Sequence, residues 1–226
     1  MAYNHLIQGL IYNTLRKDED YASFLHNKGY VADHNQVFKL FTFGSLRGQH
    51  RTEEKDIIFS DMVDLEIRSA DALFIQILLT TLRPGMAIYL GKNILAIQHV
   101  RFLDKTLLDE KSKIRMVTPL TVHTRNESGN TLYYTPDEDS FFRAVENNAW
   151  QKWKSVFGAK SFDLFVGPNP DASQYRKQIC HFKDEIVEGY KGSFYLEGSP
   201  KCINFLYNTG LGAGNSKGFG MFEKEK

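Results

Sequence analysis

The chain has 226 residues, of which 42% are hydrophobic and 24% are charged, and its formal net charge is +1. These values are ordinary for a globular protein and provide no overall attraction to nucleic acid, so a nucleic-acid partner would have to meet a local positive field. Two cysteines far apart in sequence exclude a disulfide framework and favour a reducing, cytoplasmic location. The start has no basic and apolar leader, and the longest apolar run, 72–79, is too short to span a membrane.

The first half of the chain predicts an alternation of helices and hairpins. Apolar spacing predicts helices over 3–16, 20–27 and 70–82, with Asn4 and Ser69 as caps of the first and the last. Alternating residues predict a strand over 38–43, and hairpins that pair 56–59 with 63–67 and 86–90 with 94–102. The charged segment 105–112 has no clear period and is interpreted as a linker between domains 1–112 and 113–226.

The second half predicts a strand-rich unit with two helices. Strands are expected within 113–124, 162–166, 179–182, 185–197 and 219–222, and helices over about 136–157 and 199–207. This is the β-α-β-β-α-β order of the ferredoxin-like fold. The first half resembles the same unit without its first strand. The predicted class is therefore α+β, with tandem ferredoxin-like (RRM-like) domains of which the first lacks its leading strand.

A glycine-rich loop lies near the end of the chain. It holds five glycines in eleven residues, Gly210, Gly212, Gly214, Gly218 and Gly220, together with Ser216 and Lys217. Glycine allows positive φ, and successive free N–H groups in such a loop can bind an anion such as phosphate. Apolar segments at 203–207 and 218–222 argue against a flexible tail. No Gly-Lys-Ser/Thr follows, so the loop is not a Walker motif.

Three residues near the start have side chains suited to one reaction. Tyr12 lies on the first helix, His26 ends the second, and Lys39 begins the strand that follows. Each has an ordinary structural explanation when it is taken alone. Together they are the types required to cleave RNA by its own 2′-hydroxyl, which needs two proton transfers and a cation at the phosphorane. Histidine suits proton transfer near neutral pH best.

Several stretches then carry a resemblance to a known family. They are Tyr3-Asn4-His5 with 8–13, Phe24-Leu25-His26, the strand 38–43, Thr118-Pro119-Leu120, and the glycine-rich loop that ends Lys217-Gly218-Phe219-Gly220. The chain resembles, almost from end to end, the CRISPR-associated endoribonucleases that process CRISPR repeat RNA, the Cas-six family. The glycine-rich loop with Gly-Phe-Gly is the most specific part of this resemblance.

The resemblance implies a metal-independent endoribonuclease without a cofactor. It implies 2′-OH attack on CRISPR repeat precursor RNA, with 2′,3′-cyclic phosphate and 5′-OH ends, and subunits of an effector complex as further partners. By the same resemblance, His26 gives or takes a proton, Tyr12 assists the 2′-OH and Lys39 stabilises the phosphorane. Which proton Tyr12 and His26 each handle is left open. A missing first strand would expose inner strand edges, which another strand or a second copy in a homodimer would cover.

Other residues and other functions remain open at this stage. Arg47 and Arg51 lie either in a solvated loop or in an arm that contacts RNA, and Lys191, Lys201 and Lys217 could follow phosphates. The aromatic residues Tyr133, Tyr134, Phe194 and Tyr195 either stack on bases or belong to the core. The histidines show no ligand spacing, so no metal site is predicted. The alternatives are a non-catalytic repeat-RNA-binding protein of an effector complex, and an enzyme that binds a small phosphorylated ligand in the glycine-rich loop.

Overall fold

A computed structural model describes residues 3–54, 56–103, 108–170 and 175–225. The linker predicted at 105–112 lies partly outside these residues, and the domain boundary at 112 stays a prediction. Within the described residues, no helix is both long and apolar enough to cross a bilayer.

The C-terminal half is built on a four-stranded antiparallel sheet. Its strands are β9 (Lys111–Met116), β12 (Leu164–Pro168), β15 (Ser193–Gly198) and β16 (Phe222–Lys224), in the spatial order β12-β15-β9-β16. Helix α4 (Asp139–Phe157) connects β9 to β12, and α5 (Pro200–Thr209) connects β15 to β16. This places the first and third strands of the unit at the centre of the sheet. The predicted ferredoxin-like order of this half is confirmed.

Local sequence explains the two helices of this sheet. Phe141, Val145, Ala149 and Trp153 recur every four residues on α4 and are buried, as their spacing predicts. The Ser199 hydroxyl accepts a hydrogen bond from the Cys202 amide, and Pro200 occupies the first helical turn of α5. These apolar faces pack on the sheet to form the larger core cluster.

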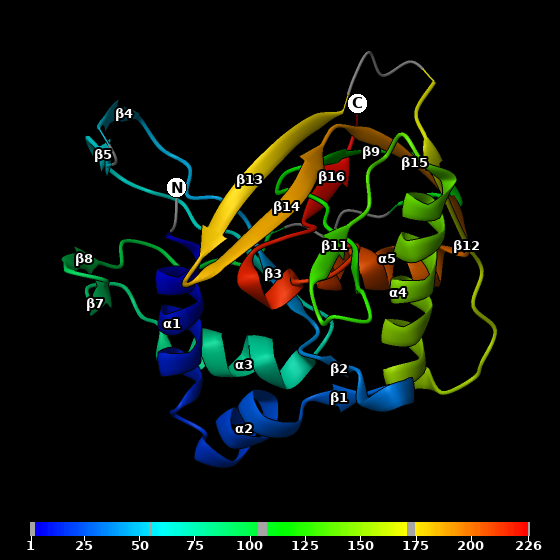
Figure 1. The fold of residues 1–226 in the computed structure, drawn as a ribbon. Helices are drawn as coiled ribbons and strands as arrows, with labels where there is room; N and C mark the ends of the chain where they lie inside the picture. The colour runs from blue at the N-terminus through cyan, green and yellow to red at the C-terminus, as the bar shows by residue number, and fades with distance from the viewer. Residues whose placement is uncertain (1–2, 55, 104–107, 171–174, 226) are drawn as a thin grey trace.

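Two hairpins extend from the C-terminal half. They are β10 (His123–Arg125) with β11 (Thr131–Tyr133), and β13 (Arg176–Phe182) with β14 (Glu185–Lys191). The second is the long ribbon in Figure 1, and its Phe182 packs with Phe219 of the glycine-rich loop. The single strand predicted over 185–197 is therefore wrong. This stretch forms two strands: β14 pairs with β13 in the hairpin, and β15 belongs to the main sheet.

The N-terminal half packs helices on a two-stranded sheet. Its elements are α1 (Asn4–Leu15), α2 (Glu19–Ser23), the π-helix η1 (Phe24–Lys28), β1 (Tyr30–Val31), η2 (Asp33–Asn35), β2 (Val37–Phe38), β3 (Phe41–Phe43), β4 (His50–Glu53), β5 (Asp56–Phe59), β6 (Ile67–Ser69), α3 (Ala72–Thr81), β7 (Ala87–Leu90) and β8 (Asn93–Ala96). Strands β3 and β6 pair, and Ile7 and Ile11 of α1 and Phe74 of α3 share a core cluster with Phe41 of β3. In the described part of the chain, the first strand comes after α1, as expected for a unit without its leading strand.

The pairing predicted within this half is partly wrong. Strand β5 pairs with β4, not with 63–67, and β6 pairs with β3. The strand predicted over 38–43 is interrupted at Leu40, where φ is +54°. Asp71, rather than Ser69, caps α3, since its carboxylate accepts from the amides of Leu73 and Phe74. The Asn4 side chain caps no helix and reaches the glycine-rich loop instead.

Candidate active site

One face of α1 connects the two regions that the sequence singled out. Asn4, Gln8 and Tyr12 are spaced by four residues and therefore share a helical face. The Asn4 amide donates to the carbonyl of Lys217 at 2.9 Å, and the Gln8 amide donates to the carbonyl of Ser216 at 2.8 Å. Tyr12 lies one turn further along, about 5.4 Å by helical pitch. The structure thus aligns the end of the glycine-rich loop with Tyr12.

Tyr12 in turn contacts His26. Their ring centroids are 5.6 Å apart at an interplanar angle of 78°, and Tyr12 also meets the buried ring of Phe41 edge-on. His26 is exposed in the middle of the π-helix η1. Such single-turn π-helices are rare and are frequent at functional sites. The imidazole is therefore held beside Tyr12 while its outer edge is open to a ligand.

Lys39 holds the backbone of the His26 segment. Its ammonium donates to the carbonyls of Leu25 and His26, the latter at 2.9 Å. The segment turns at Gly29, where φ is +63° and an added Cβ would lie 2.7 Å from the carbonyl oxygen of Phe38. This close approach brings Lys39 under η1. Tyr12, His26 and Lys39 are thus gathered in one place, with Lys39 bound to backbone carbonyls.

Burial changes the acidity of two of these groups. It raises the pKa of Tyr12 to about 12, because the half-buried phenol loses hydration that would stabilise its anion. It lowers the pKa of Lys39 for the converse reason. The Tyr12 phenol therefore stays protonated at neutral pH. It can donate a hydrogen bond but is poorly suited to accept a proton.

A carboxylate near the site connects α2 and β1 to α3. The hydroxyls of Tyr21 and Tyr30 donate to Asp71 at 2.5 and 2.6 Å, and the same carboxylate caps α3. Tyr21 lies on α2, before the π-helix in sequence, and Tyr30 lies on β1, after it, so both ends of the π-helix adjoin a segment held to Asp71. Sequence reasoning missed this group, because no local pattern links positions 21, 30 and 71.

The glycine-rich loop is mostly internal. Gly210, Gly212, Gly218 and Gly220 are buried, whereas Gly214, Ser216 and Lys217 are partly exposed. The inside of the loop is occupied by protein groups: Lys152 of α4 donates to the carbonyl of Gly210 at 2.7 Å, and the Asn215 amide donates to the carbonyls of Leu211 and Phe219. A small phosphorylated ligand therefore has little support as its occupant. The loop packs between the two halves.

Other predicted contact residues lie apart from this arrangement. Arg47 forms an ion pair with Glu66, and Arg51 forms one with Glu53 on the β4–β5 hairpin that projects from the body (Figure 1). Phe194 is fully buried and belongs to the core. Tyr133 donates its hydroxyl to the carbonyl of Ile186 at 3.0 Å. Within the described part of the chain, these residues form no hydrogen bond or ring contact with His26.

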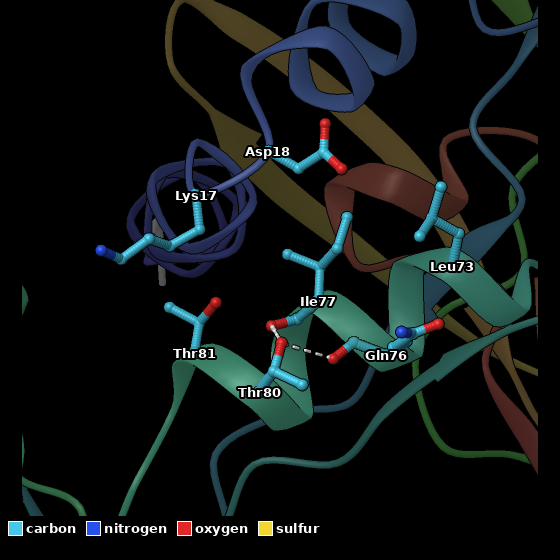
Figure 2. Close-up of a pocket in the computed structure, with 7 residues that line it drawn as sticks. All are labelled: Lys17, Asp18, Leu73, Gln76, Ile77, Thr80 and Thr81. Atoms are coloured by element: carbon cyan, nitrogen blue, oxygen red, sulfur yellow. Dashed lines mark hydrogen bonds between the residues drawn. The ribbon is translucent and has the colours of Figure 1, made fainter.

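A pocket of about 250 Å³ lies between the end of α1 and α3 (Figure 2). It is lined by Lys17, Asp18, Leu73, Gln76, Ile77, Thr80 and Thr81. The Thr80 hydroxyl donates to the carbonyls of Gln76 and Ile77, as the dashed lines in Figure 2 show. None of the predicted site residues lines this pocket. His26, by contrast, is exposed beside the half-buried ring of Tyr12.

The fold and this surface define a tandem ferredoxin-like protein, and comparison identifies its family. Residues 103–224 match the model of the family described as CRISPR associated protein Cas6, C-terminal, which is more than half of the chain. The chain belongs to this family.

Individual relatives extend the similarity over the full chain. The CRISPR-associated endoribonuclease Cas6 1 of Methanocaldococcus jannaschii is 26% identical over 236 residues, covering 98% of this chain and 86% of the relative. The structure of a Cas6-related protein from Pyrococcus furiosus superposes with a TM-score of 0.84 at 18% identity, covering 100% of this chain and 91% of that one. A structure described as a RAMP protein binding different RNA substrates gives a TM-score of 0.75 at 17% identity, with 100% and 93% coverage. These structural likenesses support the fold of both halves.

Proposed function

We propose that this chain is an endoribonuclease that cleaves CRISPR repeat precursor RNA without a metal ion. The 2′-oxygen loses its proton and bonds to phosphorus, while the bond from phosphorus to the 5′-oxygen breaks and that oxygen gains a proton. The products are 2′,3′-cyclic phosphate and 5′-OH ends. Membership of the family, and the endoribonuclease name of its relative from M. jannaschii, support RNA processing as the general activity.

The observation that carries the proposal is the α1 face shared by the glycine-rich loop and Tyr12. An RNA strand that contacts Ser216 and Lys217 would continue along this face to Tyr12 and His26. The loop supplies one partly exposed ammonium, Lys217, which forms an ion pair with Glu185 of the β13–β14 hairpin. Phosphate contacts of this kind position a strand without selecting its sequence.

The site favours a division of roles between Tyr12 and His26. His26 exchanges the proton, because an imidazole is the side chain best suited to proton transfer near neutral pH. Tyr12 keeps its proton and donates a hydrogen bond to the phosphate or to a reacting oxygen, since its pKa of about 12 leaves almost no phenolate at pH 7. Lys39 donates to the backbone carbonyl of His26, so its positive charge lies close to this histidine.

Cleavage of repeat RNA in the presence of EDTA tests the function. We expect the wild-type protein to cut at one position with EDTA present, and His26→Ala to cut about 10²–10⁴-fold more slowly, as is typical when a general acid or base is removed. RNA binding by the variant should stay close to wild type, since the imidazole is exposed and supports little packing.

His99→Ala is the matched control, because His99 is exposed and lies outside the site. Its cleavage rate should equal the wild-type rate. Tight binding without cutting in the wild type would support the non-catalytic alternative. Loss of cutting with EDTA would contradict the metal-independent reaction, and a lack of RNA affinity would contradict both functions.

A further inference from the structure

Asn27 lies directly beside the imidazole of His26. The Nδ1 atom of His26 is 2.8 Å from Oδ1 of Asn27, and the Nδ2 of Asn27 donates to the hydroxyl oxygen of Ser23 at 3.3 Å. In this arrangement the amide nitrogen faces Ser23 and the amide oxygen faces the ring. An amide oxygen only accepts hydrogen bonds, so Nδ1 of His26 must carry the proton that it donates.

This hydrogen bond determines which nitrogen can react. With a proton fixed on Nδ1, the neutral ring has its lone pair on Nε2, and the charged ring has its exchangeable proton on Nε2. Proton transfer to or from RNA therefore passes through Nε2 alone. Tyr12 packs edge-on against the same ring, and Lys39 holds the carbonyl of His26, so the ring and the backbone are both supported.

We propose that Asn27 is the positioning residue of this site, which holds His26 in its Nδ1–H form and directs Nε2 toward the RNA. The inference rests on the proposed function for its effect on cleavage. The hydrogen bond to His26 is a property of the free protein and can be tested without RNA. Ser23 contributes through its hydrogen bond to the Asn27 amide, which restrains the Asn27 side chain.

Nitrogen NMR of the histidine-labelled protein measures the tautomer directly. We expect the neutral His26 ring of the wild type to carry its proton on Nδ1, and Asn27→Ala to shift the population toward Nε2–H. Ser23→Ala should shift it in the same direction by a smaller amount. Lys28→Ala, a change to an exposed neighbour on the same π-helix, should leave the His26 signals as they are, which separates the hydrogen bond from a loosened segment.

Cleavage kinetics supply the second readout. Asn27→Ala should lower kcat by about 10–100-fold with little change in KM, by analogy with the range found when the hydrogen-bond partner of a metal-ligating histidine is removed. Asn27→Asp should retain the Nδ1–H form, and its carboxylate should stabilise the imidazolium, so that the limb of the pH–rate profile due to His26 moves to higher pH.

The two proposals fail in different ways. An unchanged tautomer in Asn27→Ala, or an unmoved pH profile in an active Asn27→Asp, would overturn the role of Asn27. Normal cleavage by His26→Ala would overturn the catalytic role of His26, while the tautomer measurement would still decide whether Asn27 orients the ring.

Discussion

Lys152 has an ammonium group in the interior of the protein. It is 1% exposed, and its Nζ donates to the carbonyl of Gly210 at 2.7 Å and to Oδ1 of Asn215 at 2.5 Å. Among the described residues it forms no ion pair, and burial lowers its pKa to about 7. Removing a charge from water is costly unless polar groups replace the hydration. Here carbonyl and amide oxygens of the glycine-rich loop do so.

Lys152 should make stability depend on pH. The unfolded chain binds a proton at this lysine up to its ordinary pKa near 10.4, whereas the folded chain releases it above about pH 7. Between these values the unfolded state binds more protons, so the free energy of unfolding should rise by about 2 kcal/mol from pH 7 to pH 9. Urea unfolding at several pH values measures this change.

Lys152→Met should abolish that rise and also leave the loop oxygens unpaired, which lowers stability. Lys160→Met, which removes an exposed lysine, should keep the wild-type dependence on pH. A difference between wild type and Lys152→Met that is constant from pH 7 to pH 9 would contradict the lowered pKa.

At the scale of elements, the contact between α1, β3 and the glycine-rich loop decides the site geometry. Gly218 has φ of +85°, and a Cβ added there would lie 2.5 Å from the ring of Phe43 and 2.8 Å from the Asn4 amide nitrogen. The Thr42 hydroxyl donates to the carbonyl of Phe219 beside it. There is therefore no room for a side chain where the loop meets the N-terminal half.

Gly218→Ala should separate α1 from the loop and weaken both folding and RNA cleavage. Gly129→Ala is a matched control, because Gly129 has a similar φ of +81° but no atom within 4 Å of an added Cβ. Both variants place a side chain at a positive φ. Overpacking should lower the free energy of unfolding of Gly218→Ala by about 1–3 kcal/mol more than that of Gly129→Ala. Thermal unfolding and the rate of RNA cleavage measure the two effects; equal losses in both variants would argue against a tight contact.

Elements with strong local signals were predictable from sequence. The apolar spacing of α4, the Ser199-Pro200 start of α5 and the strand order of the second half were confirmed. The pairing of β3 with β6 was missed, because the two strands are far apart in sequence. The β4–β5 hairpin between them has no clear alternation of apolar and polar residues. Strand β4 is fully exposed, so burial leaves no pattern in its residues.

The site was predictable only in part. The resemblance singled out Tyr12, His26 and Lys39, and the structure places them together. Asn27 and Lys152 were missed, because their roles depend on contacts that form only after folding. The sequence did carry one indication of a buried Lys152. On α4 this lysine lies about one helical turn after Ala149 and directly before Trp153, and both of these residues belong to the apolar face. Nothing in the sequence indicates the π-helix that presents His26.

At the scale of the whole molecule, Arg68 joins the two halves near the last strand. Its guanidinium donates to the carbonyl of Phe222 at 2.6 Å, lies 3.8 Å from the ring centroid of Tyr207, and pairs with Glu66. The glycine-rich loop makes a second connection through Asn4 and Gln8. Both connections hold the halves in one arrangement. Under the proposed function, we expect an RNA strand bound at the loop to lie in register with His26.

The most direct test uses repeat RNA with a single 2′-deoxy nucleotide at the cleavage position, in the presence of EDTA. The proposed reaction requires that 2′-hydroxyl as its nucleophile, so the modified RNA should bind with nearly normal affinity and remain uncut. The unmodified RNA should give 2′,3′-cyclic phosphate and 5′-OH ends. Cleavage of the 2′-deoxy RNA at the normal rate would contradict the proposed reaction.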